Sequence, residues 1–309
     1  MSRLVIRDAG PFTTVQDLGR PGYLRVGIPP SGPMDREAFI LANRLVGNAD
    51  GAAALESTYS GPRVEFSDER LVAITGADMP VTLDGAAAPR WESFRVRAGG
   101  VLRLGAARWG VRCYLAVSGG IDTPPALGSR ATYVRGQLGG LGGRTLQKGD
   151  ALPLGRAGAS RPARVTRERV PDYTIEPDVR VVLGPQDDRF TPAGIAAFLE
   201  GPYEMLPQSD RMGARFRGPR IEHARGHDIV SDGVALGGIQ VIGEGQPIVL
   251  LVDRQSTGGY TKIATVCSFD IGRVGQGKPG QLLRFGRVTV GEAHAILRSR
   301  RQEIDTAIE

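Results

Sequence analysis

Residues 94–105 read FRVRAGGVLRLG, two short runs in which apolar and polar residues alternate on either side of two glycines. This alternation is typical of a strand with one buried face. Gly99 and Gly100 can supply the positive φ angles that a tight two-residue turn requires. The sequence therefore predicts a β-hairpin made of residues 95–98 and 101–104.

Runs of the same kind surround this stretch: LVIRD (4–8), RVEF (63–66), LVAITG (71–76), PVTLDG (80–85) and RCYLAVSGG (112–120). The 309 residues include 44 glycines and 21 prolines, which indicates frequent turns. Strands at this density predict a mainly β fold, either a sandwich or a barrel, with a few short helices. One helix is predicted between Asp35, a good N-cap, and Gly47, with apolar residues facing inward.

A division into two domains, 1–160 and 161–309, is expected. Residues 156–177 contain three prolines, many charges and weak periodicity, which is typical of a linker. Beyond it the same pattern returns, with strands at 179–184, 239–243, 247–253 and 261–266, and a helix after Thr191. Thr289 and Glu292 form a capping box for a terminal helix. The second half therefore looks like a second β domain.

Composition argues against several classes of protein. The net charge is +6 with a pI near 9.7, but the arginines are scattered and aromatic residues make up only 6%. We therefore expect no nucleic-acid partner. The longest aliphatic run, 248–252, is far too short for a membrane span, and the first ten residues lack a signal-peptide core, so a cytoplasmic protein is expected.

Cysteine and histidine spacing predicts neither a disulfide nor a metal site. Cys113 and Cys267 lie in separate apolar segments and are expected to be buried thiols. His223 and His227 are four residues apart, but Gly226 between them and the absence of helical periodicity make a shared metal-binding face improbable. Solvated loop histidines are the expected alternative.

Residues 10–35 form the first candidate site, because polar side chains alternate there with glycines that let the backbone approach a ligand. Asp17 supplies a carboxylate, Arg20 a guanidinium and Ser31 a hydroxyl. The structural alternative is that Asp17 and Arg20 pair with each other and fix the loop.

Residues 250–260, LLVDRQSTGGY, form the second candidate site. The segment leaves an apolar strand and presents Gln255 and Thr257 before Gly258 and Gly259. Consecutive N–H groups at such a bend can form a nest for a phosphate or carboxylate. A plain glycine turn between two strands is the alternative.

Two further stretches carry weaker signals. Residues 208–218 place Asp210 beside Arg211, and arginine suits two-pronged contacts with carboxylate or phosphate. Residues 136–144, GQLGGLGGR, contain a glycine pattern but open no helix, so a tightly turned loop is expected rather than a dinucleotide site.

At these loops the sequence resembles a known family, called biotin-dependent carboxyltransferase or allophanate hydrolase subunit 2, which includes KipA and the C subunit of the prokaryotic 5-oxoprolinase. The resemblance runs over essentially the whole chain. It is carried by TTVQDLGRPGY (13–23), SGPMD (31–35), ANRLVGN (42–48), TGAD (75–78), YLAVSGGID (114–122), DRMGAR (210–215), SDG (231–233) and GQPIVLLVDRQSTGGY (245–260).

The resemblance implies two related cyclophilin-like β-barrel domains. It also implies an ATP-dependent (with Mg²⁺) opening of the lactam of 5-oxo-L-proline to L-glutamate, carried out with two partners, one KipI-like and one LamB/YcsF-like. The chain alone is then expected to be inactive. The alternatives are the carboxyltransferase subunit of a biotin-dependent urea carboxylase-like system, and a non-catalytic regulatory partner of a KipI-like protein.

Residue roles follow from residue type and motif position. Asp17 and Asp210 are expected to handle a proton or orient a base. Substrate or phosphate contacts are expected from Arg20, Ser31, Arg211, Gln255, Thr257, Gly258 and Gly259. No metal ligand is expected, and the chain has no Met-Lys-Met site for covalently attached biotin.

Overall fold

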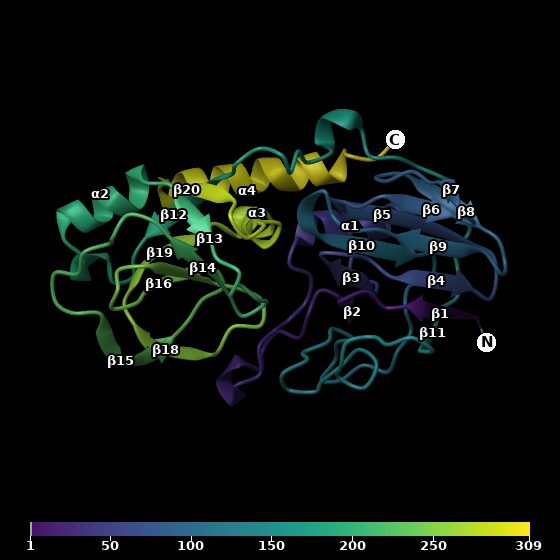
Figure 1. Cartoon of the computed structure of the whole chain (residues 1–309), viewed down its shortest axis with the longest axis horizontal. Helices are drawn as coiled ribbons and strands as arrows, with labels where there is room; N and C mark the ends of the chain where they lie inside the picture. The colour runs from purple at the N-terminus through teal and green to yellow at the C-terminus, as the bar shows by residue number, and fades with distance from the viewer. Residues whose placement is uncertain (1) are drawn as a thin grey trace. The chain divides into compact units, whose positions relative to one another are not determined.

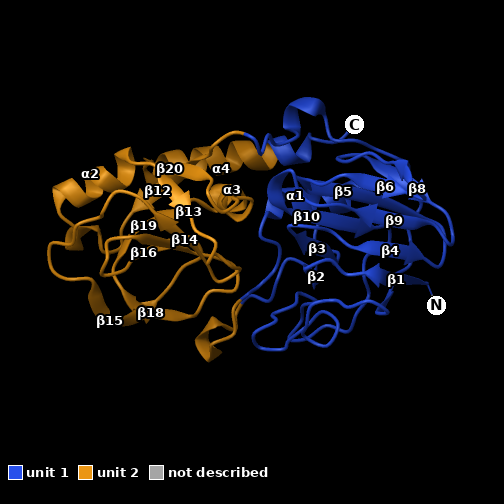
Figure 2. Ribbon diagram, viewed as in Figure 1, with its two compact units in different colours: residues 1–21, 30–174, 303–309 blue, residues 22–29, 175–302 orange. Residues whose placement is uncertain are grey.

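The computed structural model describes residues 2–309 and divides into two compact units. Unit 1 contains the described residues up to Pro21, together with Pro30–Thr174 and Glu303–Glu309, and unit 2 contains Gly22–Pro29 and Ile175–Gln302 (Figure 2). The unit boundary after Thr174 differs from the expected division at residue 160. Ser93 N donates to the Ala163 carbonyl at 2.8 Å, which joins part of the expected linker to unit 1.

The strands of unit 1 form two sheets (Figure 1). The six-stranded sheet has the order β11 (Ala151–Pro153), β1 (Arg3–Asp8), β4 (Arg63–Phe66), β9 (Val101–Leu104), β6 (Val81–Leu83), β7 (Ala86–Ala87). The five-stranded sheet has the order β2 (Phe12–Gln16), β3 (Ala54–Thr58), β10 (Trp109–Val117), β5 (Arg70–Asp78), β8 (Ser93–Val96). Apolar residues from both sheets pack into one core cluster.

The central strands β5 and β10 are apolar on both faces because the sheet is covered on both sides. Val72 and Leu115 belong to the core cluster shared with the other sheet. Ala73 and Tyr114 belong instead to a second cluster with helix α1 (Arg36–Leu45). The helix begins as predicted, since the Asp35 side chain accepts from Ala38 N at 3.1 Å.

A strand at Val101–Leu104 forms as predicted, and the one predicted at 95–98 lies at Ser93–Val96, but the predicted hairpin is wrong. β8 pairs with β5 in one sheet, whereas β9 pairs with β4 and β6 in the other. Gly99 has a φ of 76°, but Gly100 is not among the positive-φ residues, so the two-residue hairpin turn is not formed. Gly100 N instead donates to the Arg97 carbonyl, closing a turn that allows the flanking strands to splay.

Segments far apart in the sequence complete unit 1. Leu4 on β1 lies opposite Leu152 on β11. Near the C-terminus, Val165 forms an isolated bridge with Ile308, and Arg164 N and Glu309 N each donate to the other residue's carbonyl at 2.9 Å. Both ends of the chain are therefore hydrogen-bonded into unit 1.

Unit 2 is built around a closed seven-stranded barrel. Its strand order is β12 (Asp178–Leu183), β19 (Lys262–Val266), β16 (Gly238–Val241), β17 (Pro247–Leu250), β14 (Gly213–Arg217), β13 (Tyr203–Met205), β20 (Leu282–Arg287). The mainly β prediction is confirmed: unit 2 closes into a barrel, and unit 1 keeps its strands in two sheets.

Aromatic packing fills one part of the unit 2 interior. The Phe285 ring stacks on Phe198 with centroids 4.7 Å apart and meets Tyr203 at 5.7 Å and Phe216 at 6.1 Å. Phe198 lies on α2 (Pro192–Glu200), whose N-cap is Thr191 as predicted. The remaining helices are α3 (Ile271–Gly275) and α4 (Val290–Asp305), with short 3-10 turns at Leu24–Val26, Arg167–Arg169, Asp187–Arg189 and Ser268–Asp270.

The terminal helix begins as expected. Thr289 N donates to Glu292 Oε2 at 2.7 Å, and Glu292 N donates back to Thr289 Oγ1 at 3.2 Å, which completes the predicted capping box. Within residues 2–309, no helix combines the length and apolar character needed to cross a membrane.

Candidate functional site

Asp17 and Arg20, in unit 1, each hydrogen-bond to residues 129–131. The Asp17 carboxylate accepts hydrogen bonds from Ser129 Oγ and Arg130 N, both at 2.5 Å, and from Gly19 N at 2.9 Å. Arg20, 1% exposed, donates from Nη2 to the Ala131 carbonyl. Both side chains therefore hold residues 129–131 against the first candidate loop.

Ser31, in the same loop, combines burial with a strained backbone. The residue is 6% exposed and has a φ of 56°, in the left-handed region that few side chains adopt. Its Oγ has no hydrogen-bond partner among the described residues. Ser31 therefore offers a buried hydroxyl to which no described residue hydrogen-bonds.

A buried network fixes the SGPMD segment that follows Ser31. Glu56 Oε2 accepts from Met34 N and from the Tyr114 hydroxyl, both at 2.8 Å. Asp35 N donates to the Tyr114 oxygen at 2.7 Å, and the Tyr173 hydroxyl donates to Asp35 Oδ2 at 2.9 Å. Burial, and then the neighbouring carboxylates, raise the pKa of Tyr114 and Tyr173 well above the usual value, so both hydroxyls stay protonated.

In unit 2, the predicted residue Arg211 forms a buried ion pair with Asp253. Arg211 Nε lies 2.8 Å from Asp253 Oδ2, and Nη2 lies 3.4 Å from Oδ1. The pair links strands β14 and β17 at their adjoining ends, because Asp253 N also donates to the Arg211 carbonyl. Asp210 is exposed and accepts from Met212 N and Gly213 N, which stabilises the turn before β14.

The predicted glycine bend at QSTGGY is wrong, because this segment forms a strand. Thr257–Tyr260 is β18, which pairs with β15 (Asp228–Gly233) in a separate two-stranded sheet, called here the β15–β18 ribbon (Figure 1). Neither Gly258 nor Gly259 has a positive φ, so the expected nest of N–H groups is not formed. Thr257 and the preceding Gln255 are exposed.

Two polar residues outside the predicted set lie beside this ribbon. Gln240 on β16 and Lys262 on β19 are cross-strand partners in the barrel and are 3% and 2% exposed. Gln240 Nε2 and Lys262 Nζ have no hydrogen-bond partner among the described residues. A carboxylate oxygen of Asp232, on β15, lies 3.9 Å from the Lys262 ammonium.

One signal in the sequence could have identified Lys262. The chain has 39 basic residues, of which three are lysines, and Lys262 is the one inside a predicted barrel strand. A lysine within an apolar strand is rare unless its charge has a partner or a role. Gln240 carries no comparable signal, because a polar residue in an alternating strand normally faces solvent.

Two of the three histidines, His223 and His227, lie against aromatic rings. His223 packs 4.8 Å from the Phe190 ring, and its Nε2 lies 3.1 Å from Thr261 Oγ1. His227 stacks on Tyr260 at 6.2 Å. Burial lowers the pKa of His223, which favours the neutral imidazole. Within residues 2–309, no group of three or more His, Cys, Asp or Glu side chains is arranged to hold a metal ion.

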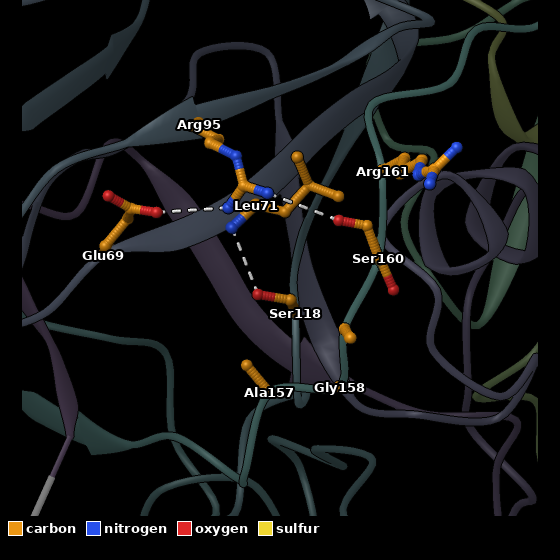
Figure 3. A pocket seen from close by; sticks show the side chains of 9 residues that line it. Glu69, Leu71, Arg95, Ser118, Ala157, Gly158, Ser160 and Arg161 are labelled. Atoms are coloured by element: carbon orange, nitrogen blue, oxygen red, sulfur yellow. Dashed lines mark hydrogen bonds and ion pairs between the residues drawn. The ribbon is translucent and has the colours of Figure 1, made fainter.

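A surface hollow of about 260 Å³ in unit 1 contains none of the predicted residues (Figure 3). Arg95 spans it, forming an ion pair with Glu69 at 3.1 Å and donating to the Ser160 carbonyl at 3.5 Å. Both charged side chains of the pair are more than half exposed, so solvent screens them and the hollow offers no built binding site.

Comparison with known proteins identifies the family. The model of the carboxyltransferase domain, subdomains A and B, matches residues 26–287. This chain belongs to the carboxyltransferase domain family. The family resemblance found in the sequence is thereby confirmed.

This carboxyltransferase domain is similar to 5-oxoprolinase C subunits and to urea amidolyases, among other proteins. It is 39% identical to the C subunit of the Escherichia coli 5-oxoprolinase over 94% of this chain and 93% of that protein. It is 35% identical to the urea amidolyase of Lachancea kluyveri over 98% of this chain, but it spans only 18% of that enzyme. The solved K. lactis urea amidolyase superimposes with a TM-score of 0.93 at 34% identity, over 98% of this chain and 20% of that one.

Within the carboxyltransferase domain, three of the predicted site residues thus differ from Gln240 and Lys262 in what they can do. Asp17, Asp210 and Arg211 already bind groups of the protein itself. Gln240 and Lys262 present donors without hydrogen-bond partners among the described residues, which is the arrangement that recognises a ligand oxygen.

Proposed function

We propose that this chain is the C subunit of an ATP-dependent 5-oxoprolinase. In this proposal it works with a KipI-like partner and a LamB/YcsF-like partner to open the lactam of 5-oxo-L-proline to L-glutamate. The supporting observation is how much of each relative this chain matches. It is 39% identical to the corresponding E. coli protein over 93% of that protein, whereas it matches only a fifth or less of the length of the urea amidolyases.

The chemistry of the reaction needs donors directed at oxygen. A lactam carbonyl becomes a better electrophile when its oxygen is phosphorylated, and charge then develops on oxygen atoms that N–H donors can stabilise. Binding the substrate also needs donors, and Lys262 and Gln240 are buried donors of unit 2 suited to that binding role. Their ammonium and amide groups would bind and orient an acceptor oxygen of the substrate.

The residue roles predicted from the motifs remain part of the proposal. Asp17 and Asp210 would orient polar groups or handle a proton. Substrate or phosphate contacts would come from Arg20 and Ser31 in unit 1 and, separately, from Arg211, Gln255, Thr257, Gly258 and Gly259 in unit 2. ATP and Mg²⁺ are proposed to bind within the complex, and no residue of this chain is assigned to them. No covalently attached biotin is proposed for this chain.

The test is reconstitution. The chain is purified alone and together with its KipI-like and LamB/YcsF-like partners, and glutamate release from 5-oxoproline is measured with and without ATP. We expect ATP-dependent glutamate release by the complex and almost none by the chain alone. Glutamate release by the isolated chain would contradict the proposal that the chain needs its partners. An inactive complete complex would contradict the proposed reaction.

The second candidate is a biotin-dependent carboxyltransferase, which is favoured by the TM-score of 0.93 to the K. lactis urea amidolyase. This function predicts that the chain consumes carboxybiotin in the presence of urea or a related amide. Carboxybiotin labelled with ¹⁴C in its carboxyl group distinguishes it from lactam hydrolysis, because only the carboxyltransferase reaction moves the label into the amide.

A further inference from the structure

Lys262 and Gln240 form a pair of buried donors side by side in the barrel wall. They are directly opposite each other on β19 and β16, and residues in register on neighbouring strands point to the same face of a sheet. Both side chains are at least 97% buried, and both terminal nitrogens lack a hydrogen-bond partner within the described chain. Two such donors in one place point to a missing acceptor.

The energetics support this interpretation. An ammonium group removed from water without a hydrogen-bonded partner carries a large desolvation cost. Asp232 offers only partial compensation, because its oxygen lies 3.9 Å away, beyond hydrogen-bond range, and its side chain is 62% exposed. A ligand oxygen that bound both nitrogens would remove that cost.

We propose that Lys262 and Gln240 bind the carboxylate group of a small organic acid. Both side chains offer donors, so the ligand must carry acceptor oxygens, and the lysine charge favours an anion. The Asp232 carboxylate nearby disfavours a doubly charged phosphate more than a singly charged carboxylate. Resting on the proposed function, this assigns the pair to the carboxylate of 5-oxoproline or of its product.

The β15–β18 ribbon covers this site. Gly258 lies over Gln240 so closely that a Cβ at position 258 would come within 2.3 Å of Gln240 Nε2. Gly258 and Asp232 are opposite each other in the ribbon. Gly258 lies beside the Gln240 amide, and Asp232 lies beside the Lys262 ammonium. The two strands pair only with each other, and a two-stranded sheet has little stability of its own. In this proposal the ribbon shifts to admit the carboxylate.

Anion-dependent stabilisation of the full chain tests the site directly. Melting temperatures and calorimetric affinities are measured with acetate, L-5-oxoproline and inorganic phosphate for the wild type, Lys262→Met and Gln240→Leu. Lys148→Met, which alters an exposed lysine, is the control. We expect both carboxylates to raise the wild-type and control melting temperatures. Lys262→Met should weaken carboxylate binding roughly tenfold or more, and Lys262→Arg should recover part of it.

The other outcomes overturn the proposal. The site is excluded if carboxylates stabilise the wild type and Lys262→Met equally, or if they do not stabilise the wild type at all. Lys262-dependent binding of phosphate in preference to acetate excludes the carboxylate assignment. If Lys262→Met fails to fold, the same comparison between Gln240→Leu and the wild type decides.

Kinetics of the reconstituted complex separate this proposal from the proposed function. Lys262→Met should raise the KM for 5-oxoproline roughly tenfold with a smaller change in kcat, while Lys148→Met leaves both unchanged. If the complex hydrolyses 5-oxoproline with the same KM in Lys262→Met and Lys148→Met, the proposed function stands and the proposed site is wrong. If the complex is inactive on 5-oxoproline but this chain still binds acetate through Lys262, the proposed function is wrong and the proposed site stands.

Discussion

Arg211 and Asp253 form an ion pair that is buried on both sides, with Nε 2.8 Å from Oδ2 and both residues at most 7% exposed. Asp253 closely precedes the QST segment that leads into the β15–β18 ribbon. Removing one partner leaves the other charge buried and uncompensated, which is costly, whereas removing both is much less so.

We therefore predict that Arg211→Met and Asp253→Asn each lower the free energy of unfolding by about 3 kcal/mol. The double variant should lose less than the sum of the two. Chemical denaturation of the three variants and the wild type measures this coupling. Additive losses would show that the two side chains act independently.

Gly258 and Gly259 should respond differently to alanine. A Cβ at Gly258 would come within 2.3 Å of Gln240 Nε2, whereas at Gly259 the contacts begin at 3.4 Å, an ordinary separation. Because neither glycine has a positive φ, neither substitution strains the backbone. We expect Gly258→Ala to displace the Gln240 amide and weaken carboxylate binding, with a small change in melting temperature.

Gly259→Ala is the comparison variant: its Cβ would not contact Gln240, so it should leave the Gln240 amide in place and weaken carboxylate binding less than Gly258→Ala does. Calorimetric titration with L-5-oxoproline, alongside thermal melts, makes the comparison. Equal affinities in the two variants would show that the ribbon does not constrain Gln240.

The two cysteines should be slow to react in the native protein. Complete burial raises the pKa of the Cys113 thiol to about 12, and burial also raises the pKa of Cys267. Since the thiolate is the reactive species, we expect no alkylation of Cys113 by iodoacetamide at about pH 8 until the protein is unfolded. Mass spectrometry of labelled peptides, with a urea-unfolded sample as reference, measures this. Rapid labelling of native Cys113 would contradict the packing of β10 in the core.

Stability should depend on pH through Asp150, which is near β1. The hydrogen bond from Arg144 holds the pKa of this carboxyl below its usual value. A carboxyl with a lowered pKa in the folded state contributes stability above its unfolded pKa, and that contribution is lost as the pH falls through the folded value. Asp150→Asn should therefore cost about 1 kcal/mol at about pH 7, and the difference from wild type should shrink below about pH 4.

Melts of both proteins from about pH 7 down to about pH 3 test this. A difference that stays constant over that range would mean that the Arg144–Asp150 pair contributes nothing that depends on ionisation.

Local patterns predicted the elements of the fold but not their partners. Caps at Asp35, Thr191 and Thr289 act within one turn of helix, and all three were found as predicted. Strands on either side of Gly99 were also predicted, the first of them two residues too late, yet they belong to different sheets. Strand pairing depends on residues such as Phe66, far away in the sequence, whose N–H and C=O bind the Gly99–Gly100 turn.

The candidate site was predicted only in part for the same reason. Arg20 and Arg211 lie in recognisable sequence motifs, but their side chains bind other groups of the protein itself. Gln240 and Lys262 belong to ordinary strands, and their importance appears only when the barrel places them together without acceptors among the described residues.

The pairing of residues 164–165 with 308–309 affects where the chain can be shortened. Residues 303–309 belong to unit 1, although residues 175–302 before them belong to unit 2. A chain cut before residue 303 would therefore keep the strands of both units but lose the backbone partners of Arg164 and Thr166.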